Sequence, residues 1–229
     1  MKKTGLLLLL TVLVSASALP APAAPPQQWV EGTNYDVLEQ PQPTTVPAGK
    51  VEVMEVFSYA CPACNAFQPY VQALERTLPR NAQMVFLPAS FIPTEDWPMF
   101  QRAYFAAQSL GIADRTHQAI YDAVWKTGQL ATMDPQTDRI KRPAPSIEDA
   151  ANYYAQLTGV SPQTFLAAAR SFGVETRMRA ADDQITAMQV EGTPTIVVAG
   201  KYRVNLQSLH AIGDVIPLVK FLVAKASAR

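Results

Sequence analysis

Cysteine and histidine are scarce in this sequence, with two of each among 229 residues. Two cysteines close at most one disulfide within the chain, so a small scaffold held by several disulfides is excluded. Basic residues are not in excess either, because 19 of them stand against 19 acidic ones. That balance argues against a general nucleic-acid binder and against a polybasic membrane binder. The low charged fraction, 17%, comes with 48% hydrophobic residues, which excludes intrinsic disorder and suffices for a full core.

A long hydrophobic run is also missing. The apolar stretch Leu6–Val14 is shorter than the roughly 20 residues that a bilayer requires. It follows two lysines and precedes small residues, which is the order of a secretory signal peptide. Cleavage motifs of the A-x-A type occur at 16–18 and 21–23, and we favour the second. We expect residues 1–23 to be removed, with a retained membrane anchor as the alternative. The mature protein then works in an oxidising space outside the cytoplasm.

Strand patterns occur near both ends of the expected mature chain. Residues 51–59 begin with alternation and become almost continuously apolar, which is typical of a strand buried on both faces. Ala199-Gly200 separates two further apolar runs and predicts a hairpin in which the glycine takes a positive φ. The predicted strands are residues 35–38, within a proline-rich extended arm at 20–50, and residues 51–59, 84–87, 195–198 and 201–204.

Strand patterns are absent from about residue 91 to residue 173, where apolar residues recur every three or four positions. Ser146 and Ser161 are suited to begin helices as N-caps, and Gly173 is suited to end one. Residues 133–145 are expected to form a polar loop. The predicted helices are 97–110, 114–126, 147–157 and 162–172 in this region, and 62–78, 174–188 and 215–226 outside it.

The motif Cys61-Pro62-Ala63-Cys64 stands between the apolar strand and the first long helix. Its disulfide would close too short a loop to stabilise the fold much, so a redox role explains the motif better. Backbone N–H groups and the helix dipole favour negative charge at a helix N-terminus, so we expect the pKa of the Cys61 thiol to lie below the free value of about 8.5. A stabilised thiolate favours the reduced pair, which makes the disulfide an oxidant. Cys61 is then the exposed attacking atom, and Cys64 the shielded resolving thiol.

Two other roles are open to a cysteine pair of this spacing. A zinc site needs two more ligands, and besides carboxylates the chain offers only His117 and His210, without ligand-like spacing. A disulfide with a purely structural role is the second alternative. We favour a redox-active Cys61–Cys64 disulfide because a strand-to-helix junction is where such a pair is expected, and we predict no metal and no cofactor.

Several features together carry a resemblance to a known family. They are the strand and helix on either side of Phe57–Cys64, the distant Gly192-Thr193-Pro194-Thr195 before a hairpin, and the segment Gly200–Asn205. With these features the chain resembles thioredoxin-fold proteins of the DsbA family. The resemblance implies an α/β, thioredoxin-like fold with an inserted all-helical domain. Residues 24–90 and 174–229 then form the thioredoxin-like domain, and residues 91–173 form the insertion.

The resemblance also implies a cis peptide bond between Thr193 and Pro194, next to the cysteines. The Thr193 backbone is then free to pair with an extended substrate segment, as a strand added to a sheet. An ordinary trans-proline at a strand start is the alternative. We expect the substrate to be contacted by Pro62, Ala63 and Thr193.

Glu55 lies six residues before Cys61, and the resemblance makes it the acid beneath the site that handles the proton of Cys64. An outward-facing strand glutamate is the alternative. DsbA proteins often carry a lysine on the neighbouring strand, whereas residues 81–84 contain none, and an unpaired buried carboxyl would have a raised pKa. Ala63 is a second departure, because the best-known family motif has histidine there. We expect Cys61 to remain acidic, but less so than in relatives with the histidine.

These features predict a periplasmic thiol:disulfide oxidoreductase that donates its disulfide to unfolded or reduced exported proteins. The resemblance implies reoxidation by a membrane partner of the DsbB type, and we expect a monomer that binds no nucleic acid. The nearest alternative is a disulfide isomerase or reductase of the DsbC kind, although the arm at 24–50 is too short for the dimerisation domain of those proteins. The other alternative is a redox-silent binding or chaperone module.

Overall fold

A computed structural model describes residues 29–134, 137 and 139–228. The expected signal peptide, residues 1–23, lies outside the described residues. Within the described ranges, no helix combines the length and the apolar character that crossing a bilayer would require.

Five strands form the central sheet, in the spatial order β1-β7-β6-β2-β3. The central strand β2 pairs in parallel with β3 and antiparallel with β6. The edge strand β1, from the proline-rich arm, pairs antiparallel with β7. The long apolar strand, the hairpin and the short arm strand are therefore confirmed. The strands are β1 (Tyr35–Val37), β2 (Val51–Phe57), β3 (Ala82–Pro88), β6 (Thr195–Val198) and β7 (Tyr202–Val204).

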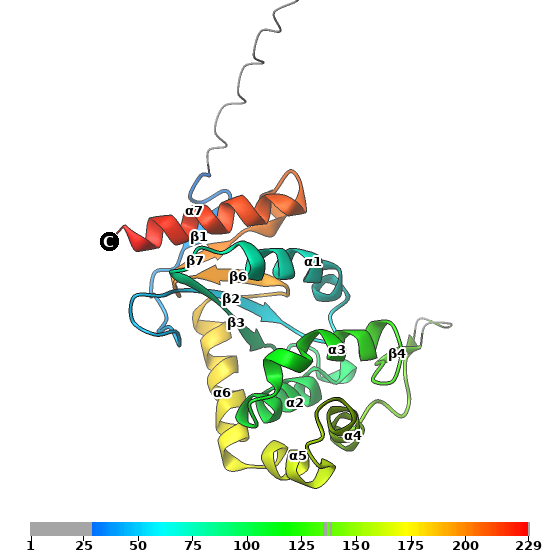
Figure 1. Cartoon of the computed structure of the whole chain (residues 1–229). Coiled ribbons are helices and arrows are strands. Elements are labelled where there is room, and N and C mark those ends of the chain that lie inside the picture. The colour runs from blue at the N-terminus through cyan, green and yellow to red at the C-terminus, as the bar shows by residue number, and fades with distance from the viewer. Residues whose placement is uncertain (1–28, 135–136, 138, 229) are drawn as a thin grey trace, which may run out of the picture.

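Helices cover both faces of this sheet (Figure 1). One face is covered by α1 (Pro62–Thr77) and α7 (Val215–Ser227), whose Leu74 and Leu222 are buried with Ile196 of the sheet. The other face is covered by a helical layer, which we define as α2 to α6. Its members are α2 (Trp97–Ser109), α3 (Ala113–Trp125), α4 (Ile147–Thr158), α5 (Pro162–Ala169) and α6 (Phe172–Ala187). Short 3-10 helices lie at Pro93–Glu95, Leu206–Ser208 and Ile212–Asp214.

Two local predictions in the helical region are wrong. The expected polar loop at 133–145 contains a two-stranded ribbon, β4 (Met133–Asp134) with β5 (Arg139–Ile140). The expected stop at Gly173 lies inside the first turn of α6 instead. There the Ser171 hydroxyl accepts a hydrogen bond from the Val174 N–H and begins the next helix, so α5 ends earlier, at Ala169.

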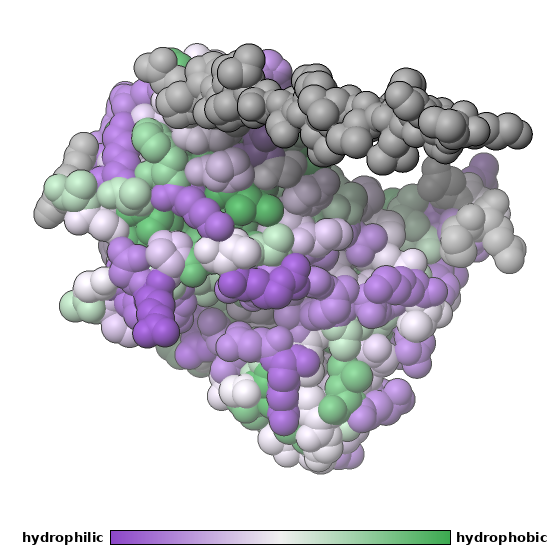
Figure 2. Space-filling model, turned by 45° about the horizontal axis from the view of Figure 1, so that its top comes forward, coloured by the Kyte–Doolittle hydropathy of each residue, from purple (hydrophilic) through white to green (hydrophobic). Residues whose placement is uncertain are grey.

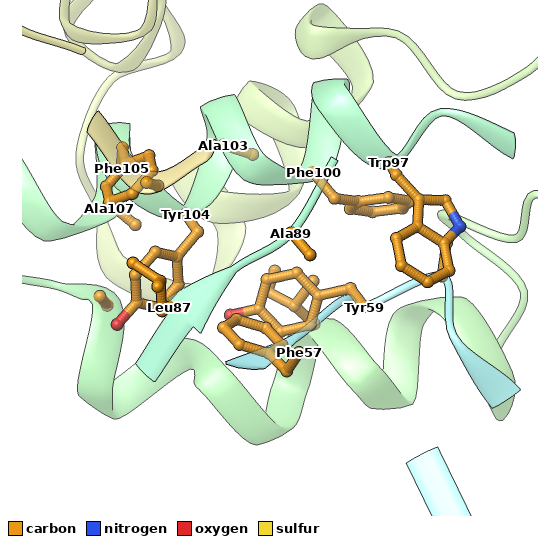
Figure 3. Packing of buried hydrophobic residues seen from close by; sticks show 14 of the residues in the cluster. Phe57, Tyr59, Leu87, Ala89, Trp97, Phe100, Ala103, Tyr104, Phe105 and Ala107 are labelled. Atoms are coloured by element: carbon orange, nitrogen blue, oxygen red, sulfur yellow. The ribbon is translucent and has the colours of Figure 1, made fainter. Parts of the chain in front are cut away.

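The core between the sheet and the helical layer is aromatic. Phe57 and Tyr59, from the end of β2 and the turn after it, pack edge-to-face with ring centroids 5.1 Å apart. Phe57 also lies 5.4 Å from the ring of Tyr104 on α2. Figure 3 shows these rings beside Leu87 and Phe100. This packing fixes the end of β2, from which the chain turns into the cysteine motif.

The proline-rich arm crosses the β6–β7 hairpin. Ala199 and Gly200 both have positive φ, at 56° and 60°, whereas only the glycine was expected to. The Gln42 N–H donates to the Gly200 carbonyl at 2.8 Å. A Cβ at position 200 would lie 2.1 Å from the Gln42 carbonyl oxygen, so the close approach of the arm requires glycine there.

Candidate active site

Cys61 is the N-cap of α1. The chain leaves β2 at Phe57 and makes a turn in which the Cys61 N–H donates to the Ser58 carbonyl at 3.1 Å. The Cys61 sulfur accepts a hydrogen bond from the Cys64 N–H at 3.4 Å, and Pro62 occupies the first turn of the helix. Proline is tolerated there because the first N–H groups of a helix have no partner within it. The motif therefore begins a helix as the sequence predicts.

The two cysteines are free thiols in this structure. Cys64 is fully buried, as expected for a shielded thiol. Cys61 was expected to be exposed, but only 5% of its surface is accessible, because the chain around Thr193 lies against it. Pro62 and Ala63, between the cysteines, are exposed. An incoming group therefore meets Pro62 and Ala63 before it reaches the sulfur.

The pKa values of the two thiols move in opposite directions. A hydrogen bond from the Cys64 thiol is the largest influence that lowers the pKa of Cys61, from its ordinary 9.0 to about 6. Burial opposes this change, while the Thr193 side chain and the N–H groups of Cys64 and Ala63 reinforce it. The pKa of Cys64 is raised well above its usual value, chiefly by burial. Near neutral pH the pair is therefore a Cys61 thiolate beside a protonated Cys64.

The peptide bond between Thr193 and Pro194 is cis, as predicted. The Cys61 sulfur lies 3.5 Å from the Thr193 carbonyl oxygen. Thr193 and Pro194 also line a groove of about 740 Å³, together with Glu191, Asn205 and Gln207. The structure thus brings the loop before β6, which lines this groove, into contact with the nucleophilic sulfur.

Glu55 is completely buried in β2. Neither carboxyl oxygen has a hydrogen-bond partner among the described residues. Burial raises the pKa of Glu55 well above its usual range, and the negative charges of Glu75 and Cys61 raise it further. The β3 residue opposite Glu55 is Phe86, so the facing position on the neighbouring strand carries no cation. The outward-facing alternative for Glu55 is wrong, and the carboxyl is protonated well into the pH range where an exposed glutamate is ionised.

Sequence reasoning missed three residues of α3 that contact the segment before Cys61. His117, Tyr121 and Trp125 recur every four residues and therefore share one face of the helix. The Trp125 indole N–H donates to the Tyr59 carbonyl at 2.8 Å, and the Tyr121 hydroxyl to the Ser58 carbonyl at 3.5 Å. The spacing predicts that the three side chains share one face of the helix, but it does not predict which segment that face contacts.

His117 lies within the aromatic core and lines none of the surface around Cys61. Its Nδ1 is 3.0 Å from the Tyr59 hydroxyl oxygen, and its ring stacks on Phe86 at 4.3 Å between centroids. Burial lowers the pKa of His117 to about 3, so its imidazole is neutral at physiological pH. The described residues hold no group of three or more His, Cys, Asp or Glu side chains that could bind a metal ion.

Comparison with known proteins finds relatives that match most of the chain. The family model described as Thioredoxin matches residues 46–216, which is most of the chain. A thiol:disulfide interchange protein DsbA from Pseudomonas aeruginosa is 31% identical over 222 residues, which cover 96% of this chain and 97% of that protein. A protein of the same name from Burkholderia cepacia is 30% identical over 225 residues, covering 97% and 96% respectively.

Solved structures give the same result. The crystal structure of the oxidoreductase DsbA from Xylella fastidiosa matches with a TM-score of 0.75 and 32% identity, over 87% of this chain and 98% of that chain. A crystal structure of DsbA from Pseudomonas aeruginosa matches with a TM-score of 0.72 and 31% identity, over 87% and 95%. Coverage of this extent includes the helical layer as well as the sheet.

Proposed function

The chain belongs to the DsbA family of thioredoxin-fold proteins, and we propose that it donates a Cys61–Cys64 disulfide to exported proteins in the periplasm. Its fold is α/β and thioredoxin-like with a helical insertion, and its activity is that of a thiol:disulfide oxidoreductase. We assign the reaction to these two residues because Cys61 is acidic and lies at a helix N-terminus, whereas Cys64 is buried and protonated.

The reaction begins with the oxidised protein and a substrate that carries two thiols. A substrate thiolate attacks the Cys61 sulfur, the bond between the two protein sulfurs breaks, and its electron pair goes to Cys64. The product is a mixed disulfide between Cys61 and the substrate. A second substrate thiolate then attacks the substrate sulfur of that bond, and Cys61 leaves as a thiolate. The substrate is oxidised by two electrons, and the protein pair is reduced.

The acidity of Cys61 favours this direction. A thiol with a low pKa is a good leaving group, so the second step is fast. Stabilising the thiolate also stabilises the reduced pair relative to the disulfide, which makes the disulfide the stronger oxidant. The hydrogen bonds from Cys64 and from the N–H groups of α1 supply this stabilisation.

Cys64 needs a proton when it leaves the disulfide, because its raised pKa disfavours a buried thiolate. Glu55 is the group that we assign to supply it. Its carboxyl is buried, protonated by virtue of its raised pKa, and electrostatically coupled to Cys64. Proton transfer from a positioned side chain accelerates reactions of this kind by about 10²-fold or more.

The substrate binds as an extended segment beside the sulfur. Pro194 has no N–H, and the Thr193 backbone lies just before the start of β6 and next to Cys61, where it is suited to pair with such a segment. Pro62 and Ala63, which follow Cys61 in the chain, are exposed and provide apolar contact. The substrates are unfolded or reduced exported proteins, and a membrane protein of the DsbB type reoxidises the pair. The protein acts as a monomer.

Oxidative refolding of reduced ribonuclease tests this function. With glutathione disulfide as the terminal oxidant, the wild-type protein should accelerate the recovery of activity. Cys61→Ala should abolish the acceleration, and Cys64→Ala should accumulate a mixed disulfide between Cys61 and the substrate. A redox-silent binding module would give no turnover and no dependence on Cys61. An isomerase would act best on scrambled ribonuclease and weakly on the reduced form.

A further inference from the structure

The loop that covers Cys61 begins at the end of α6. This helix is the part of the helical layer that leads back to the sheet (Figure 1), and it ends at Ala187. Six residues further along the chain, the carbonyl oxygen of Thr193 lies 3.5 Å from the Cys61 sulfur. The direction in which the chain leaves α6 therefore decides where Thr193 lies.

The turn at the end of α6 has an uncommon conformation. The Val190 N–H donates to the Ile185 carbonyl at 3.1 Å, and the Gln189 N–H donates to the Thr186 carbonyl at 2.9 Å. This pair of hydrogen bonds is the Schellman motif, which places a residue with positive φ, usually glycine, just after the helix. Here that residue is Gln189, with a φ of 53°, and residues other than glycine rarely adopt this conformation. We therefore looked for contacts from outside the turn that hold it.

Arg203 supplies such contacts from the sheet. One terminal nitrogen of its guanidinium donates to the Gln189 carbonyl and, at 3.3 Å, to the Met188 carbonyl. The other terminal nitrogen lies 3.0 Å from the carboxylate of Asp36, which stands opposite Arg203 on the neighbouring strand β1. Carbonyl groups at a helix C-terminus lack partners within the helix and attract cations. Arg203 therefore fixes the end of α6 to β1 and β7.

Arg203 and the loop also line the same groove. The groove of about 740 Å³ has Asp36 and Arg203 in its wall, together with every residue of the loop from Gln189 to Thr195. Only 25% of the Arg203 side chain is exposed. Loss of the guanidinium would therefore loosen the loop, and would do more than remove a charge from the surface.

We infer that Arg203 is a positioning residue for the reaction, because it holds the turn after α6 so that Thr193 lies against the Cys61 sulfur. This role rests on the proposed pairing of the substrate with the Thr193 backbone, and Arg203 acts through the loop without touching the reacting sulfur atoms. Without the guanidinium, Gln189 leaves its left-handed conformation more readily, and the loop moves away from the sulfur. The variant then pairs less well with a substrate segment, while its Cys61 becomes more accessible.

The first test compares how fast two dithiols reduce the oxidised protein, one a peptide with two cysteines and the other dithiothreitol. Arg203→Met keeps most of the apolar stem and removes the guanidinium. For the peptide, the second-order rate constant should fall about tenfold, because the backbone that pairs with it is misplaced. For dithiothreitol, which has no peptide backbone, the rate constant should not change. An equal fall for both dithiols, or no fall for the peptide, would overturn the inference.

The second test measures access to the sulfur in the reduced protein. Iodoacetamide alkylates the Cys61 thiolate, and the plateau that the rate reaches above the pKa of Cys61 depends on access to the sulfur. In the wild type only 5% of the Cys61 surface is accessible, because the loop covers it. Arg203→Met should raise the plateau severalfold. A plateau equal to that of the wild type would show that the loop still covers the sulfur, against the inference.

Arg102→Met is the matched control. At the other end of α6, the Arg102 guanidinium donates to the Ala169 carbonyl at 3.0 Å and lies 2.7 Å from the Glu175 carboxylate. Its exposed fraction, 29%, is close to that of Arg203, so its loss should lower the melting temperature to a similar extent. Both the peptide rate and the alkylation plateau should stay at the wild-type values. If Arg102→Met changed them as much as Arg203→Met does, Arg203 would have a purely structural role.

Asp36→Ala serves as a second variant should Arg203→Met fail to fold. It removes only the carboxylate that orients the guanidinium, from a side chain that is 45% exposed on the edge strand β1. The peptide rate should fall and the alkylation plateau should rise, each by less than expected for Arg203→Met. Wild-type values for both would then overturn the inference.

The outcomes separate this role of Arg203 from the proposed function. If the wild-type protein does not oxidise the dithiol peptide, the proposed function is wrong, and the role of Arg203 fails with it. If the wild type oxidises the peptide and Arg203→Met does so at the same rate, the role of Arg203 alone is wrong.

Discussion

At the scale of single residues, the Cys61 sulfur occupies the place that a serine or aspartate oxygen takes at most helix N-termini. A thiolate accepts hydrogen bonds much better than a thiol does, so the N–H of Cys64 at 3.4 Å favours the anion. A side chain at position 63 can add to this effect, but Ala63 offers only its backbone N–H. Position 63 is therefore the place where the acidity of Cys61 can be adjusted without disturbing the core.

We predict that Ala63→His lowers the pKa of Cys61 further, because a histidine can add positive charge and a donor near the thiolate. A decrease of about one unit corresponds to roughly 1.4 kcal/mol of additional stabilisation of the thiolate. Thiolate absorbance against pH measures the pKa, and the redox equilibrium with glutathione should shift towards the reduced pair. Ala63→Gln, which adds bulk without charge, is the control. A pKa unchanged in the histidine variant would contradict the prediction.

Glu55 predicts a pH dependence of stability. Its folded pKa lies above the unfolded value, so unfolding releases a proton between pH 4.5 and the folded pKa, and stability falls as pH rises through that window. We expect Glu55→Gln to remove this loss, which amounts to about 1.4 kcal/mol per pH unit. Urea unfolding from pH 4 to pH 8 measures the difference. Glu39→Gln, at an exposed position, should follow the wild type. Parallel curves for Glu55→Gln and the wild type would exclude a raised pKa.

The sequence predicts some residues of the site better than others. Cys61, Cys64 and the Thr193–Pro194 pair stand in recognisable motifs, and the structure brings them together. Tyr121 and Trp125 could not be assigned, because their hydrogen bonds join segments more than 60 residues apart in the chain. The exposure of Cys61 was mispredicted for the same reason, since the segment that covers it lies 132 residues further along the chain.

At the scale of elements, the contact between the arm and the β6–β7 hairpin depends on one glycine. Two apolar runs on either side of Ala199-Gly200 predicted the hairpin. The arm that crosses it is rich in proline, and its apolar residues do not recur at a regular spacing that would predict this contact. The same limit explains β4 and β5, which are two residues each and too short to show alternation. The end of α5 was mispredicted for a different reason. Ser171 caps the next helix, whereas Gly173, two residues later, was expected to end this one.

We predict that Gly200→Ala destabilises the protein by about 2 kcal/mol or more. The new Cβ would lie 2.1 Å from the Gln42 carbonyl oxygen, on a backbone with a φ of 60°. Gly213→Ala is the matched control, because its Cβ would meet only Tyr70 Cε1 at 3.7 Å, an ordinary contact. Thermal unfolding of the two variants compares them. Equal melting temperatures would show that the arm moves away from the new Cβ without loss of stability, and would contradict the prediction.

At the scale of the whole molecule, the contribution of Cys61 to the stability of the reduced protein should increase as pH rises from about 6 to 9. The pKa of Cys61 is about 6 in the folded protein against an ordinary 9.0. A lowered pKa contributes stability that is fully present above the ordinary pKa and is lost as pH falls through the folded pKa. The slope is at most about 1.4 kcal/mol per pH unit and is reduced by solvent screening. Reduced Cys61→Ser is the reference, and denaturant unfolding at several pH values measures the difference. A constant gap between the two proteins would contradict an acidic Cys61.

Hydrophilic residues predominate on the face shown in Figure 2, with apolar residues scattered among them. Apart from the neighbours Phe91 and Ile92, the large apolar side chains exposed among the described residues come from separate segments. The most exposed of them is Phe172, at the start of α6, with 83% of its surface accessible. Scattered exposure of this kind is normal for a protein of this size.

The pairing of β2 with β6 joins Val53 to Val198 across the whole helical layer. A chain that is made from its N-terminus onwards presents β2 and both cysteines long before β6 follows. Closing so large a loop is slow, since the entropy of the intervening chain is lost before the strand contacts form. The contact of Cys61 with Thr193 therefore forms late, and the site is complete only after the loop before β6 has been added to the chain and has docked.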